Sequence, residues 1–229
     1  MSCKHALSWH ELIPLFSFII LRGRCKNCKT KISYQYPIVE FVAGLIFAIL
    51  FLKLKDVFFL SSLNFFIPYA YYATLFSLLF VIAVYDLKHK IIPDMLVFAF
   101  GVLAFLGLFF FSGFGISFDN SFFYPHIPTF WQLLSGVFVA LPLALLWIVS
   151  RGAWIGLGDA KLALGLGWFL GLGRALSGIA LSFWVGAIIG VSLIFFKKSY
   201  GMKSEIPFAP FLILGAFLAF IFDLHFFVF

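Results

Sequence analysis

The chain alternates between long apolar runs and short polar links, and this pattern predicts its architecture. The runs have roughly the length of the ~20 residues that a helix needs to cross the ~30 Å hydrocarbon core of a bilayer. The fifth run is short and rich in glycine. The pattern predicts an all-α, polytopic membrane helical bundle of about seven transmembrane helices. The runs occupy residues 37–54, 66–86, 94–113, 130–150, 159–173, 175–196 and 207–228.

The polar residues gather in residues 1–36, a segment rich in Lys and Arg. We therefore predict two domains, a small cytoplasmic Cys-containing segment at 1–36 and a transmembrane domain at 37–229. The composition fits a membrane protein, because 64% of the residues are hydrophobic and 11% charged, against about 25% charged in soluble domains. The net charge of +7 is compatible with nucleic-acid binding, but the basic residues lie between apolar runs, as topology signals do. We expect the lipid bilayer as partner and no nucleic acid.

The distribution of Lys and Arg predicts the orientation in the membrane. If the N-terminal segment is cytoplasmic and the links alternate, thirteen of the 16 basic residues lie on the cytoplasmic side. Only Lys53, Lys55 and Arg174 lie on the other side, as the positive-inside rule requires. We therefore expect a multi-pass protein of the cytoplasmic (inner) membrane, with Asp86 and Asp159 at its cytoplasmic face.

Two acidic residues stand at the ends of apolar runs. Asp159 follows two glycines in Gly156-Leu157-Gly158-Asp159, and an acid at a membrane boundary indicates a functional site. The alternative is a helix N-terminus, where the helix dipole stabilises an Asp. Asp86 closes the second run, at a helix C-terminus where the same dipole disfavours a negative charge. The position of Asp86 therefore needs another reason, whereas Asp94 follows Pro93 and suits the first turn of the next helix.

A pairing of Asp86 with Asp159 would supply that reason. Two carboxyl groups brought together in a low-dielectric environment cannot both ionise easily, so one serves as general acid and the other as general base at a single pH. Such a pair can activate water against an amide carbonyl without a metal. Sequence spacing alone leaves the pairing open, because 73 positions separate the two residues.

Motifs along nearly the whole chain resemble those of the type IV prepilin peptidase family of intramembrane aspartyl proteases. The stretch from Gly156 to Leu162 is similar to its Gly-x-Gly-Asp motif, and residues 86–94 resemble its other aspartate motif, an Asp followed by a basic stretch and Ile-Pro-Asp. Residues 205–211 resemble its last motif, usually with Gly where Ala209 stands. Three N-terminal stretches also match, at residues 13–18, 21–25 and 36–40.

This resemblance implies a bifunctional enzyme. It would remove the short basic leader of prepilins or pseudopilins, commonly between Gly and Phe, and then N-methylate the new terminal residue with S-adenosylmethionine. Asp86 and Asp159 carry over as the proteolytic dyad, which needs no metal. Gly156 and Gly158 would let the substrate backbone lie close. Lys161 would bind substrate or interact with a carboxylate, or else it is a snorkelling interfacial lysine.

The cysteines raise the question of a metal and of where the chain begins. Similar enzymes often carry two Cys-x-x-Cys pairs, which suggests a four-thiolate zinc knuckle. Cys3, Cys25 and Cys28 are the candidate ligands here, and because the fourth thiol is absent, zinc binding stays open.

Cys3 resembles the second half of the first pair, and the family usually has a hydrophobic span before it. We expect that Met1 is an internal methionine, which in-frame translation of the upstream DNA would test.

Two other functions are compatible with the residues. Membrane carboxylates often serve as proton relays, so a small proton-coupled transporter is one alternative, although the acids cluster at one face and no inverted repeat is evident. A peptidase-only relative that lacks methyltransferase activity is the other. The polar segment and Glu40 are the candidate contacts for S-adenosylmethionine.

Overall fold

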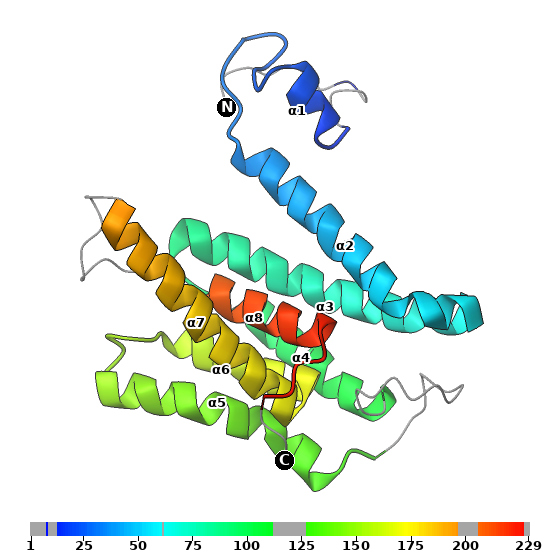
Figure 1. The fold of residues 1–229 in the computed structure, drawn as a ribbon, viewed down its shortest axis with the longest axis vertical. Coiled ribbons are helices and arrows are strands. Elements are labelled where there is room, and N and C mark those ends of the chain that lie inside the picture. Colours follow the sequence, from blue (N-terminus) through cyan, green and yellow to red (C-terminus); the bar gives the residue numbers. More distant parts are fainter. Residues whose placement is uncertain (1–7, 9–12, 61, 112–126, 197–205, 227–229) are drawn as a thin grey trace. The chain divides into compact units, whose positions relative to one another are not determined.

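A computed structural model of the protein describes residues 8, 13–60, 62–111, 127–196 and 206–226. The regular structure within these ranges is helical, beside one isolated bridge between Arg24 and Lys31, which confirms the all-α prediction. Figure 1 shows the helices in chain order. They are α1 (Phe16–Ile20), α2 (Gln35–Leu60), α3 (Ser62–His89), α4 (Asp94–Phe110), α5 (Phe130–Ser150), α6 (Leu157–Leu170), α7 (Leu172–Phe196) and α8 (Ala209–Ile221).

The helices from α2 to α8 fall on the seven predicted apolar runs. Among the residues that the structure describes, four stretches are long and apolar enough to cross a membrane. The helices α4 and α8 are shorter apolar helices, and α6 has only 14 residues. The protein is therefore a helical membrane protein, while the count of seven spans stays a prediction. The four stretches are Gln35–Asp56, Phe65–His89, Phe130–Ser150 and Leu172–Leu193.

The chain divides into two compact units, Met1–Leu52 and Lys53–Phe229. In the first unit, the backbone N–H of Leu15 donates a hydrogen bond of 2.9 Å to Oε2 of Glu40, which ties the residues before α1 to α2. The backbone N–H of Cys25 donates to the Thr30 carbonyl at 2.9 Å and closes a turn. The predicted boundary between residues 36 and 37 stays a prediction.

Helix α6 is the centre of the second unit. It contacts α4, α5, α7 and α8, and nine of its 14 residues are buried. Its small residues allow close approach, because Gly165 faces Phe100 of α4 and Gly167 faces Gly136 of α5. Small residues that admit a neighbouring helix are a main source of helix packing in lipid. This central helix begins two residues before Asp159.

Gly167 brings α6 and α5 together backbone to backbone. A Cβ atom at this position would lie 2.6 Å from the Gly136 Cα and 2.7 Å from the Ser135 carbonyl oxygen. We expect Gly167→Ala to lower the free energy of unfolding by about 1–3 kcal/mol, the usual cost of overpacking. Unfolding in detergent measures this. Gly101→Ala is the control, because a Cβ at Gly101 of α4 meets nothing within 4 Å; equal stability of the two variants would contradict the packing described here.

Candidate active site

Asp86 lies in the last turn of α3, in a buried position with 4% of its surface exposed. The helix ends at His89 because Lys90 adopts a left-handed conformation with φ of 54°. The Lys90 N–H still donates to the Asp86 carbonyl at 2.7 Å. Pro93 then precedes α4, whose first residue is Asp94, as the sequence predicted. A short connector at residues 90–93 therefore separates the buried acid from α4.

Asp159 is the third residue of α6 and is 5% exposed. Its Oδ2 accepts a hydrogen bond of 3.2 Å from the backbone N–H of Gly156, the N-cap residue. Its Oδ1 is buried and has no hydrogen-bond partner in the part of the chain that the structure describes. One oxygen of Asp159 thus caps the helix while the other stays available for chemistry. Asp159 can therefore stabilise the helix N-terminus and also act as a functional acid, the two interpretations that its sequence position allowed.

The start of α8 supplies a donor that the sequence did not predict. The backbone N–H of Ala209, the first residue of α8, lies near the Asp86 carboxyl group. Pro210 follows in the first turn, where its missing N–H costs little. A backbone donor carries no residue-type signal, so only the folded arrangement identifies it. The contact fixes α8 beside the end of α3.

One cavity of about 400 Å³ joins these elements. Asp86 and Asp159 both line it, so the structure brings together the two acids that the sequence could not pair. Gly156, Gly158 and Lys161, predicted to bind substrate, line it as well. The other lining residues are Lys90, Ile91, Ile92, Asp94, Trp154, Ile155, Ile206, Pro207 and Phe208. Three stretches that are distant in sequence therefore converge on the acid pair.

The acidic side chains of the cavity differ in whether Lys161 pairs with them. Nζ of Lys161 lies 2.7 Å from Oδ1 of Asp94, in a pair whose side chains are 47% and 73% exposed. Exposed pairs of this kind typically contribute less than about 1 kcal/mol. Lys161 therefore pairs with Asp94 and not with the buried acids Asp86 and Asp159. Asp86 and Asp159 interact electrostatically, and two buried carboxylates that line one cavity cannot both be ionised easily.

The predicted metal ligands lie in the first unit. Cys25 and Cys28 occupy the turn that Thr30 closes, and the Cys28 Sγ lies 3.1 Å from the Thr30 Oγ1. Cys3 lies outside the described residues, as does Glu205 of the last motif. The described residues contain no group of three or more His, Cys, Asp or Glu side chains suited to a metal ion. They supply two of the four ligands of a structural zinc site and do not fit one, so no step below depends on zinc.

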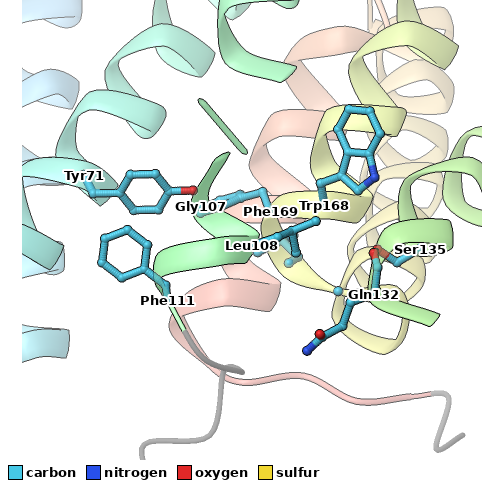
Figure 2. A pocket seen from close by; sticks show the side chains of 10 residues that line it. Tyr71, Gly107, Leu108, Phe111, Gln132, Ser135, Trp168 and Phe169 are labelled. Carbon is cyan, nitrogen blue, oxygen red and sulfur yellow. The ribbon is translucent and has the colours of Figure 1, made fainter. Parts of the chain in front are cut away.

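A second cavity of about 100 Å³ lies near the C-terminal end of α6. Figure 2 shows the Tyr71 hydroxyl pointing toward Gly107, where a Cβ atom would overlap it. Gln132 and Trp168 also line this cavity, and Tyr71 is its one ionisable side chain. The Trp168 Nε1 donates to the Leu133 carbonyl at 2.9 Å. This cavity has no pair of acids, so the candidate active site is the one at the start of α6.

The fold and the site define a class: a helical membrane protein that gathers two buried carboxyl groups from different helices in one cavity. Comparison with protein families narrows the class. Residues 73–191 match the type IV leader peptidase family, and residues 1–54 match the bacterial peptidase A24 N-terminal domain. The chain belongs to the type IV leader peptidase family.

Individual relatives agree with this assignment. The chain is 29% identical to a prepilin leader peptidase/N-methyltransferase of Bacillus subtilis over 96% of the chain and 79% of the relative. A protein with the same description from Xanthomonas campestris pv. campestris is 29% identical over 93% of the chain and 68% of the relative. One from Myxococcus xanthus is 32% identical over 89% of the chain and 55% of the relative. No solved structure matches the chain.

Proposed function

We propose that the protein is an aspartyl endopeptidase that removes the basic leader of type IV prepilins or pseudopilins at the cytoplasmic face of the inner membrane. The observation that carries this proposal is the burial of Asp86 and Asp159 in one cavity. Membership of the type IV leader peptidase family supports it. The relatives described as prepilin leader peptidases give the class of substrate.

The acid pair performs the hydrolysis with one carboxyl protonated and the other ionised. The ionised carboxylate takes a proton from water, and the water oxygen attacks the carbon of the scissile amide. The protonated carboxyl gives its proton to the amide oxygen. The carboxyl that took the proton from water then gives it to the leaving nitrogen, and the other carboxylate takes a proton from one hydroxyl of the tetrahedral adduct. The carbon–nitrogen bond breaks as the carbonyl re-forms, and the acid pair returns to its starting state. Oδ1 of Asp159, which is buried and without a hydrogen-bond partner among the described residues, is the atom best placed to exchange a proton.

The remaining walls of the cavity suit an extended peptide. Gly156 exposes the backbone beside Asp159, so a substrate main chain can approach closely. Ile155 and Phe208 offer apolar surface for the residue that follows the cleaved bond. The pair between Lys161 and Asp94 is exposed and weak, so a substrate carbonyl can replace Asp94 as the partner of Lys161. Gly156, Gly158 and Lys161 thus form our proposed substrate-binding set.

The ion pairs of the second unit support the cytoplasmic placement of the cavity. Lys53 and Arg174, two of the three basic residues assigned to the outer side, both pair with Asp223. The two cations therefore lie beside each other, as their assignment to one side requires. Their proximity supports the alternation of the links on which the positive-inside assignment rests.

The proposal extends to N-methylation of the new terminal residue. The relatives are described as N-methyltransferases, and the first 54 residues match the N-terminal domain of this peptidase group. S-adenosylmethionine, when bound, would supply the methyl group. Glu40, a candidate contact, already accepts the hydrogen bond from Leu15.

Mass spectrometry of a processed prepilin tests both activities. Detergent-solubilised enzyme is incubated with a prepilin that carries a Gly–Phe junction, with and without S-adenosylmethionine. We expect the substrate to lose its leader in both reactions and to gain the mass of one methyl group only with the cofactor. An intact substrate in the presence of folded enzyme would overturn the peptidase proposal. A cleaved but unmethylated product would overturn only the second activity.

A further inference from the structure

The connector between α3 and α4 packs directly on the first turn of α6. A Cβ atom on Gly158 would lie 3.0 Å from Cβ and 3.1 Å from Cδ1 of Ile92. Carbon atoms in optimal contact are about 3.5–4.0 Å apart. Any other residue at position 158 would therefore require Ile92 to shift by a few tenths of an ångström.

Backbone conformation does not explain why residue 158 is a glycine. The positive-φ glycines of the described chain are Gly23, Gly152 and Gly171, so Gly158 has ordinary helical geometry. It lies within α6, where alanine is favoured over glycine by up to about 1 kcal/mol. Gly156 differs, because a Cβ there would meet Oδ2 of Asp159 at an ordinary 3.4 Å. The close approach of Ile92 is therefore what favours glycine at position 158.

A second contact joins the same two segments. Asp94, two residues after Ile92, pairs with Lys161, three residues after Gly158. Residues three apart share one face of a helix, so the connector and the start of α4 lie along one face of α6. The left-handed Lys90 and the fixed φ of Pro93 limit how far this connector can bend.

We propose that Ile92 and Gly158 form a positioning contact that sets the placement of Asp86 relative to Asp159. Gly158 directly precedes Asp159, and Ile92 follows Asp86 across the short connector. A side chain at position 158 would push the connector away from α6 and move the two carboxyl groups apart. A misplacement of about 1 Å can cost roughly 10²-fold in rate. This inference rests on the proposed peptidase function and gives Gly158 a role beyond lining the substrate cavity.

The experiment compares Gly158→Ala, Ile92→Ala and the double variant in prepilin cleavage. We expect Gly158→Ala to lower kcat by roughly tenfold or more with KM within about twofold, because the added Cβ meets Ile92 and leaves in place the backbone that position 158 offers to the substrate. Ile92→Ala removes Cγ1 and Cδ1 but keeps Cβ, the atom nearest to position 158, so it relieves the contact in part. The double variant should therefore recover at least roughly threefold in kcat, a coupling expected of residues in contact. Gly101→Ala, in open space on α4, is the matched control and should cleave like the wild type.

The outcomes separate this inference from the function on which it rests. A wild-type kcat in Gly158→Ala would overturn the positioning contact, as would a raised KM or a loss of kcat that Ile92→Ala does not relieve. Failure of the wild type to cleave would instead overturn the proposed function. In that case, cysteines that replace Asp86 and Asp159 test the contact alone, since a short bifunctional thiol reagent should join them more slowly when Gly158 is Ala. An equal rate of cross-linking would contradict the contact.

Discussion

Asp86→Asn and Asp159→Asn are each expected to lower kcat for leader removal by about 10³-fold. Asparagine keeps the size of each buried side chain but cannot exchange the proton that the reaction requires, and general acid–base groups typically contribute 10²–10⁴-fold. The Gly156 N–H can still donate to an oxygen at position 159. The expected loss is therefore catalytic and not structural. Initial rates of cleavage by mass spectrometry, with melting temperatures of the same samples, measure it.

The double variant Asp86→Asn/Asp159→Asn sharpens the test. Residues that act as a unit give strongly non-additive losses, so the double variant should be no slower than the slower single variant. Asp56→Asn is the matched control, because Asp56 is an exposed acid on α2 and should keep wild-type kcat. Losses that multiply would show that the two acids act independently and would contradict the dyad.

Asp223→Asn is expected to lower the free energy of unfolding through its buried partner Arg174. Asp223 pairs with Lys53, and its Oδ1 lies 3.0 Å from NH2 of Arg174, whose side chain is only 6% exposed. Removing the acid leaves a buried guanidinium without its counter-charge, which costs roughly 3–5 kcal/mol at a fully buried pair. The Asp223 side chain is 39% exposed, so solvent screening reduces the expected cost to about 2 kcal/mol. Unfolding in detergent measures it.

The same variant separates stability from catalysis. Arg174 also donates from Nε to Nε2 of His225 at 3.2 Å, so the network ties α7 to the residues after α8, and it contributes no residue to the cavity of Asp86 and Asp159. The kcat of the folded fraction should therefore match the wild type. Unchanged stability, or a loss of kcat in fully folded protein, would contradict this assignment.

The sequence predicted the helices and the two acids because these depend on local signals. Apolar runs separated by polar links define α2 to α8, and Pro93 marks where α4 begins. The fifth predicted run, 159–173, extends beyond Leu170, where α6 ends. Asp86 is conspicuous because a helix C-terminus disfavours its charge. The number of membrane crossings is less accessible, since α6 and α8 have only 14 and 13 residues, and length alone does not determine how such helices lie in lipid.

The contacts that organise the site could not be predicted from the sequence. The Ala209 N–H reaches Asp86 only because α8 packs beside α3. Ile92 has an ordinary apolar side chain, and its importance depends on a glycine 66 positions later in the chain. Arg174 counted as a topology signal, whereas its pairing with Asp223 arises from the packing of α7 against α8. Each of these contacts joins segments that are distant in sequence.

Asp86 of α3 and Asp159 of α6 share one cavity, and their proximity carries the proposed mechanism. Cross-linking tests it without reference to activity. Cysteines replace both residues, a short bifunctional thiol reagent is added to membranes, and peptide mapping identifies the joined pair. The control pairs Asp86→Cys with Leu172→Cys, beyond the far end of the 14-residue α6, roughly 20 Å away along its axis. The account predicts efficient linking of positions 86 and 159 and little of the control pair; equal yields from the two pairs would contradict it.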